Sequence, residues 1–272
     1  MMKLSIVLST QPAKFNALAY KGELAENISK IKMLGYDGVE LAVRDPGLLN
    51  LSELKNILNE NRLPVPAIGT GQAYGEEKLS FTDPNETIRR QAIERVKSHV
   101  QLADHFGAVV IIGLVRGKIG AEVDELQAEE WLIEALTECA SENETVKIVI
   151  EPINRYETNL INTVESGLKF LDKLSLANVG LLFDTFHANI EEPSILDSII
   201  MAKDRLFHFH VADSNRWYPG AGHVDFRAII DTLVKINYNG FISAEIMPMP
   251  DADTAARKTY ENMKKILEQI ST

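Results

Sequence analysis

The chain has 272 residues, of which 45% are hydrophobic and 25% are charged, and this composition excludes disordered, collagenous and low-complexity proteins. Its formal net charge of −11 opposes binding to polyphosphates, so we expect no nucleic-acid partner. The single cysteine, Cys139, excludes an intramolecular disulfide framework, and no apolar run has the length of a membrane span. We therefore expect a cytoplasmic globular protein, with a buried structural thiol and no membrane partner.

Short runs of β-branched and aliphatic residues alternate with longer segments of helical periodicity along the chain. The eight strand-like runs are 4–9, 38–43, 65–69, 109–113, 147–150, 179–183, 206–211 and 241–245. The helical segments between and after them are 23–34, 53–61, one that follows 83–86 and ends at Gly107, 128–142, 164–174, 193–203, 226–236 and 252–270. Each repeat takes roughly 34 residues, the size of one βα unit in a barrel. The sequence therefore predicts an α/β protein, a single-domain (β/α)8 TIM barrel over residues 1–272.

Local signals mark some of these boundaries and weigh against another fold. Ser52 is the expected cap of the second helix, and Asp83, with Pro84 and Glu86 after it, is the expected cap of the third. A doubly wound open sheet is the alternative architecture. Such a sheet commonly carries a glycine-rich fingerprint after its first strand, where this chain has 9–12, Ser-Thr-Gln-Pro.

The last four predicted strands end in residue types that bind metals. In chain order these residues are Glu151, Asp184, His210 and Glu245, each roughly one βα unit after the last. The carboxyl ends of barrel strands meet at one rim, so three carboxylates and an imidazole are expected to lie together. Carboxylates crowded in this way repel one another, and a divalent cation relieves the repulsion. The oxygen-rich donor set suits one Mn²⁺ or Mg²⁺ ion, with Co²⁺ or Zn²⁺ as alternatives.

A plainer interpretation exists for each of these residues alone. A single acid after a strand is usually a helix cap or half of a surface ion pair. Four ligand-type residues in register at successive strand ends favour the metal site instead. His208 lies two residues before His210 on the same strand face, but deeper, so we expect it in the core or behind a ligand and leave it out of the site.

Three segments carry a family resemblance: 151–157 (EPINRYE), 183–192 (FDTFHANIEE) and 210–216 (HVADSNR). They resemble the signature segments of the xylose isomerase-like sugar isomerases and epimerases, nearest the ketose 3-epimerases of the D-tagatose and D-psicose type. The resemblance implies a small-molecule sugar substrate and one divalent ion. It also implies the roles of particular residues: metal ligands Glu151, Asp184, His210 and Glu245, acid/base catalysts Glu151 and Glu245, and substrate contacts Glu157, His187 and Arg216.

The three substrate contacts also have simpler interpretations. His187 lies in a predicted loop without apolar periodicity, which favours a pocket role over a core role. Arg216 is followed by Trp217 and Tyr218, so it can be a loop arginine stacked on an aromatic ring. Glu157 can pair with a nearby cation such as Arg155.

The expected reaction moves a proton beside a ketone through an enediolate, whose charge a divalent ion stabilises. Glu151 and Glu245 come from the fifth and eighth strands, on facing parts of the rim. One glutamate can remove a proton and the other can return one on the opposite face, which inverts C3 of a ketose. The same residues can also run a 1,2-shift between aldose and ketose, and the sequence separates these two reactions poorly.

Two other function classes remain as alternatives. An apurinic-site endonuclease uses the same barrel but needs extra histidines after the third and fourth strands, where 69–71 and 113–115 have none. A non-catalytic sugar-binding protein would not need paired glutamates.

The substrate can be a free ketose or a ketose phosphate. Arg116 and Lys118 can seat a phosphate, whereas Asp251 and Asp253, after the eighth strand, disfavour one, so we expect a free ketose. The expected assembly is a homodimer or a homotetramer.

Overall fold

The computed structural model of the protein describes residues 2–270, so Met1 and residues 271–272 of the expected domain lie outside the described residues. Within this range, eight parallel strands pair in chain order and close when β9 (Phe241–Ala244) pairs with β1 (Lys3–Ser9). The strands between them are β3 (Gly38–Ala42), β4 (Ala67–Gly69), β5 (Val109–Ile112), β6 (Ile148–Ile150), β7 (Val179–Asp184) and β8 (Leu206–Val211). A short additional strand, β2 (Tyr20–Lys21), pairs with the carboxyl end of β1. The predicted TIM barrel is confirmed.

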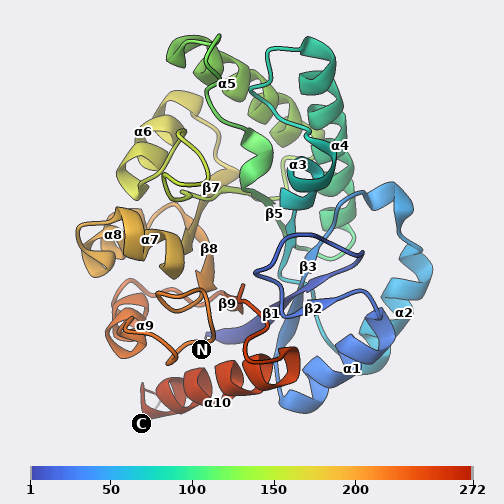
Figure 1. Ribbon diagram of the computed structural model, residues 1–272, viewed down its shortest axis with the longest axis vertical. Coiled ribbons are helices and arrows are strands. Elements are labelled where there is room, and N and C mark those ends of the chain that lie inside the picture. The colour runs from blue at the N-terminus through green and yellow to red at the C-terminus, as the bar shows by residue number, and fades with distance from the viewer. Residues whose placement is uncertain (1, 271–272) are drawn as a thin grey trace.

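Helices surround the barrel on its outside (Figure 1). The eight expected helices are α1 (Leu24–Leu34), α2 (Leu51–Asn61), α4 (Glu86–Asp104), α5 (Glu125–Glu142), α6 (Val164–Leu174), α8 (Ile195–Ala202), α9 (Phe226–Lys235) and α10 (Ala252–Ile270). Shorter helices were not predicted; they are α3 (Gly71–Glu77), α7 (Thr185–Glu191) and the 3₁₀ turns η1 (Pro46–Leu48) and η2 (Leu114–Arg116). Among the helices of residues 2–270, none combines the length and the apolar composition needed to cross a lipid bilayer.

Three helix starts differ from the predictions because other side chains cap them. Asn50, and not Ser52, accepts a backbone N–H of the first turn of α2. Asn85, and not Asp83, caps α4 in the same way. Asp124 caps α5, which therefore begins three residues earlier than predicted. In each case the capping oxygen stands one residue before the first helical residue, where it meets the free N–H groups of the helix start.

Two halves of the barrel carry different buried side chains. Strands β4 to β7 contribute an apolar cluster of Ala67, Ile111, Val149 and Leu182. The neighbouring strands β8, β9, β1 and β3 contribute buried polar residues, namely His208, His210, Ser243, Ser5 and Glu40. The main hydrophobic core joins the strands to the surrounding helices. The polar half therefore places hydrogen-bonding groups next to the rim where the predicted ligands lie.

Candidate active site

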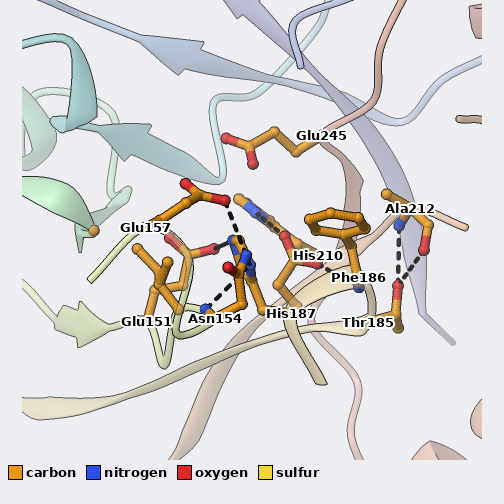
Figure 2. Close-up of polar contacts among 12 residues, drawn as sticks. Glu151, Asn154, Glu157, Thr185, Phe186, His187, His210, Ala212 and Glu245 are labelled. Carbon is orange, nitrogen blue, oxygen red and sulfur yellow. Dashed lines mark hydrogen bonds and ion pairs between the residues drawn. The ribbon is translucent and has the colours of Figure 1, made fainter. Parts of the chain in front are cut away.

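Four strands bring the four predicted ligands to one rim of the barrel. Glu151 directly follows β6, Asp184 ends β7, His210 lies in β8 and Glu245 directly follows β9. One donor atom from each side chain lies within 4.8 Å of the donor atoms of the other three. Figure 2 shows Glu151, His210 and Glu245 around a common space. The structure therefore brings together the residues that the strand ends predicted, and we call them the four-residue cluster.

The inner atoms of the four-residue cluster lack hydrogen-bond partners. Glu151 Oε1, Asp184 Oδ2 and His210 Nδ1 are buried, and none of the three has such a partner among the described residues. Buried polar atoms in proteins are nearly always paired, and one cation at the centre of the cluster would satisfy all three. Carboxylate oxygens with one imidazole nitrogen suit Mn²⁺, Mg²⁺, Co²⁺ and Zn²⁺. The residues present therefore fit a single divalent ion.

Burial and like charges change the proton affinities in the cluster. Burial, together with the neighbouring carboxylates of Glu245 and Asp184, raises the pKa of Glu151 to about 8. Burial acts to lower the pKa of His210, but the ionised Glu40 beside its ring outweighs this effect and raises that pKa to about 10. Near neutral pH and without a metal ion, Glu151 and His210 therefore both hold protons.

We expect the affinity for Mn²⁺ to rise between about pH 6 and about pH 8.5, because a cation must displace these protons from Glu151 and His210. Below their raised pKa values both groups are protonated, so a lower pH opposes binding. Titration calorimetry in two buffers with different ionisation enthalpies measures the affinity and the number of protons released. A dissociation constant that does not change over this pH range would contradict the expectation.

The two oxygens of Asp184 face different partners. Oδ1 accepts a hydrogen bond from the N–H of Phe186 at 2.7 Å and caps α7, while Oδ2 faces the cluster. Asp184 therefore both caps α7 and belongs to the four-residue cluster. The cap also starts a helix where a loop was predicted. His187 therefore lies in α7, and the prediction that it lies in a loop is wrong. His187 is buried, with Nε2 3.7 Å from Glu151 Oε1.

His187 contacts Asn154 through one ring nitrogen and Arg216 through the other. Asn154 Nδ2 donates to Glu157 Oε1 at 2.9 Å and lies 2.8 Å from His187 Nδ1, as the dashed lines in Figure 2 show. Asn154 Oδ1 accepts from the N–H of Tyr156, which holds the amide in this orientation. Burial lowers the pKa of His187 to about 3, so the ring is neutral. Its Nδ1 faces the amide of Asn154, and its Nε2 lies 3.2 Å from Arg216 Nη1, a group that can only donate, so both ring nitrogens of His187 face hydrogen-bond donors.

Arg216 reaches the cluster from the loop after β8. Its Nη1 lies 3.3 Å from Asp184 Oδ2, and its Nη2 contacts Glu245 Oε2. Its guanidinium also lies 4.6 Å from the centre of the Phe186 ring. The stacking partner is therefore Phe186 and not either of the two aromatic residues that follow Arg216 in the chain. Arg216 thus contacts the four-residue cluster and stacks on an aromatic ring at the same time.

Sequence reasoning missed Glu40 and Asn154. Glu40, in β3, is only 1% exposed and accepts hydrogen bonds from His208 Nε2 at 2.7 Å and from His210 Nε2 at 2.9 Å. The available signal was one charged residue inside an otherwise apolar strand. His208 is buried beside Glu40 and lies outside the four-residue cluster, which agrees with its predicted place.

A cavity of about 300 Å³ includes the cluster in its lining, a size suited to a small molecule. Glu151, His210 and Glu245 line it together with the predicted substrate contacts Glu157, His187 and Arg216. Its apolar lining consists mainly of Val7, Phe15, Leu18, Ile111, Leu114 and Ile153. The cavity therefore combines apolar walls with a few convergent polar groups.

Arg116 does not provide the phosphate seat that the sequence allowed. It is fully buried, and its guanidinium donates to the backbone carbonyls of Gly113, Glu151 and residues 160 and 161. These four contacts hold the backbone of Glu151 against a neighbouring loop. Lys118 is exposed and is not among the described residues that line the cavity. Neither cation is therefore placed to bind a phosphate in this cavity.

Comparisons with known proteins agree with the fold. The family profile described as xylose isomerase-like TIM barrel matches residues 28–266. A D-psicose 3-epimerase from Agrobacterium fabrum is 40% identical over 224 residues, which cover 80% of this chain and 77% of that protein. An L-ribulose 3-epimerase from Methylomonas sp. is 32% identical over 217 residues, which cover 78% of this chain and 74% of that protein.

A solved structure extends the likeness over nearly the whole chain. The crystal structure of a D-allulose 3-epimerase from Methylomonas sp. in complex with D-allulose has a TM-score of 0.82 and 25% sequence identity. The match covers 97% of this chain and 98% of that one. These findings confirm the resemblance: the chain belongs to the xylose isomerase-like TIM barrel family and is an isomerase-class enzyme.

Proposed function

We propose that this protein is a metal-dependent sugar epimerase that inverts C3 of a free ketose. The observation that carries the proposal is the convergence of two glutamates, Glu151 and Glu245, on one cluster in a cavity of ligand size. The relatives named L-ribulose 3-epimerase and D-psicose 3-epimerase support the same reaction. Paired carboxylates suit acid/base catalysis, for which a non-catalytic sugar-binding protein has no need.

In this proposal the four-residue cluster holds one divalent ion, with Mn²⁺ as the first choice. The buried donor atoms of Glu151, Asp184 and His210 that lack a hydrogen bond support it, as does the mixture of oxygen and nitrogen donors. When bound, the ion supplies Lewis-acid stabilisation of the negative charge that develops on the sugar oxygens.

The two glutamates do the proton transfer. Inversion at C3 requires a proton to leave one face of the carbon and another to arrive on the opposite face. Glu151 and Glu245 reach the cavity from β6 and β9, so one carboxylate oxygen can take the C3 proton while the other carboxyl group supplies one. The two residues exchange roles in the reverse reaction.

Three further side chains hold the sugar in place. Arg216 donates from its guanidinium to the oxygen on which negative charge develops, and His187 contacts a neighbouring oxygen. Glu157 accepts a hydrogen bond from a sugar hydroxyl. Because Asn154 joins Glu157 to His187, these two contacts keep a fixed separation. The carbon to be inverted then stays between the two catalytic glutamates.

The charges of the cavity favour an uncharged sugar over a sugar phosphate. The acidic residues that line it are Glu40, Glu76, Glu151, Glu157 and Glu245. Its lysine and arginine lining, among the described residues, consists of Lys14 and Arg216. Lys14 Nζ lies 3.4 Å from Glu76 Oε2, and Arg216 already faces two carboxylates. A phosphate would therefore meet more negative than positive charge.

We expect the Mn²⁺-loaded enzyme to convert free ketoses into their C3 epimers at least about ten-fold faster, in kcat/KM, than the corresponding ketose phosphates. The reason is the repulsion between a phosphate and the acidic lining of the cavity. Liquid chromatography of the sugars formed from each member of a ketose and ketose-phosphate panel measures this ratio. Turnover of the phosphates alone would contradict the substrate assignment, and turnover of no ketose at all would contradict the reaction.

The endonuclease alternative finds no support at the rim. Its additional histidines would stand after β4 and β5, where Gly69, Thr70 and Gly113 line the cavity. The net charge of −11 also opposes binding to a nucleic acid.

We also propose a cellular location and an assembly for the enzyme. A cytoplasmic location is supported by Cys139, which is buried as a free thiol as the sequence predicted. A homodimer or a homotetramer stays the expected assembly. Size-exclusion chromatography with light scattering measures it.

A further inference from the structure

Glu40 lies inside the barrel, and the proposed reaction gives it no task. It belongs to β3, whereas the two imidazoles that it meets come from β8, which β9 and β1 separate from β3. Glu40 Oε2 lies 2.7 Å from His208 Nε2, and Glu40 Oε1 lies 2.9 Å from His210 Nε2. Closure of the barrel thus places a buried carboxylate directly behind one of the proposed metal ligands.

These contacts determine which nitrogen of His210 can bind a metal ion. An ionised carboxylate only accepts hydrogen bonds, so Nε2 of His208 and Nε2 of His210 must both donate to Glu40. The other nitrogen of His210, Nδ1, is buried, lacks a hydrogen-bond partner among the described residues and lies 3.8 Å from Asp184 Oδ2. Nδ1 is therefore the atom of His210 that faces the carboxylates of the cluster.

We propose that Glu40 is a positioning residue for the metal centre, which acts on the ion only through His210. It keeps the His210 ring protonated on Nε2 and turned so that Nδ1 faces Glu151, Asp184 and Glu245. A carboxylate behind a ligating imidazole also makes the imidazole a stronger ligand. The inference rests on the metal site of the proposed function and adds the residue that orients its imidazole ligand.

His208 holds Glu40 in its place. Histidines two residues apart on one strand point to the same side, so both rings of β8 can reach one carboxylate. The rings pack edge to face with their centroids 5.3 Å apart. Glu40 cannot turn away from His210 without leaving His208 unpaired in a buried place, which is costly. The arrangement of the three residues is therefore rigid.

The variant Glu40→Gln tests the proposal because it keeps the shape of the side chain and removes its charge. One of the two imidazoles must then face the amide NH₂ group, and it can accept from that group only without its Nε2 proton. The matched control is Glu192→Gln, a carboxylate that accepts from the N–H of Val164 and from Ser198 among the outer helices. We expect calorimetry with Mn²⁺ alone to show a dissociation constant about 10- to 100-fold higher for Glu40→Gln, and an unchanged one for Glu192→Gln.

The outcomes separate this proposal from the proposed function. Equal Mn²⁺ affinity in wild type and in a folded Glu40→Gln protein would overturn the positioning role, because a purely structural role changes thermal stability without changing affinity. Wild-type protein that binds no divalent ion would overturn the metal site itself, and the role of Glu40 with it.

If Glu40→Gln does not fold, the wild-type protein carries the test. NMR of ¹⁵N-histidine-labelled protein loaded with diamagnetic Zn²⁺ reports the protonation of each ring nitrogen. We expect His210 to bind the ion through Nδ1 and to keep its proton on Nε2. Binding through Nε2, or a proton on Nδ1 of the loaded protein, would overturn the proposal.

Discussion

Glu151→Gln and Glu245→Gln are each expected to lower the kcat of ketose epimerisation by about 10²- to 10⁴-fold. The amide keeps the size of the side chain but cannot carry the proton. In one variant the C3 proton is not removed, and in the other no proton is returned on the opposite face. The rate at which the epimer forms, measured with Mn²⁺-saturated protein, checks the expectation.

The metal content of each variant must be measured together with its rate, because the same two glutamates are proposed ligands. A variant that retains Mn²⁺ and loses turnover separates proton transfer from ligation. We expect at least one single variant to exchange the C3 proton with solvent without forming the epimer. The control is Glu138→Gln, a carboxylate that pairs with Arg90 away from the cavity. Wild-type activity in either glutamate variant would show that the acid/base assignment is wrong.

Removal of divalent ions by a chelator is expected to abolish turnover, and added Mn²⁺ is expected to restore it. Asp184→Asn removes a charge from the cluster, and His210→Ala removes a donor atom. We expect each variant to weaken Mn²⁺ binding by more than about 100-fold, the upper end for residues that only support a ligand. Competition with a metal-binding dye measures the affinity.

Asp184→Asn is the sharper of these two variants. The asparagine oxygen can still accept from the N–H of Phe186, so the cap of α7 survives while the group that faces the cluster changes. Asp184→Ala removes both the capping oxygen and the group that faces the cluster. The difference in unfolding free energy between the two variants therefore gives the contribution of the cap, which we expect to be about 1 kcal/mol. Protein that retains no metal after dialysis and turns over as fast as before would rule out the metal site.

The barrel could be predicted because parallel strands are covered on both faces and therefore appear as short continuous apolar runs. The short helices α3 and α7 could not be predicted in the same way. Each has seven residues, too few for a clear apolar periodicity, and α3 contains Gly71 and Gly75. The start of α7 depends on Asp184, which the sequence presented as a ligand. Only the geometry shows that the Asp184 carboxylate both caps a helix and joins the cluster.

The four-residue cluster could be predicted because each member stands at a strand end, and the barrel fixes where strand ends meet. The role of Glu40 could not be predicted, because its histidine partners lie 168 and 170 residues away in the chain and meet it only when the barrel closes. Arg116 illustrates the opposite case. Its place after a strand allowed a phosphate contact, but the fold turns its guanidinium inward to backbone carbonyls.

Proton exchange at C3 of the substrate tests the proposed reaction most directly. Wild-type enzyme, Mn²⁺ and a free ketose are incubated in D₂O, and NMR identifies the carbon that takes up deuterium. Two-glutamate inversion predicts that deuterium enters at C3 and appears in the epimer that forms. Deuterium at C1 and never at C3 would identify an aldose–ketose isomerase and contradict the proposed C3 epimerisation.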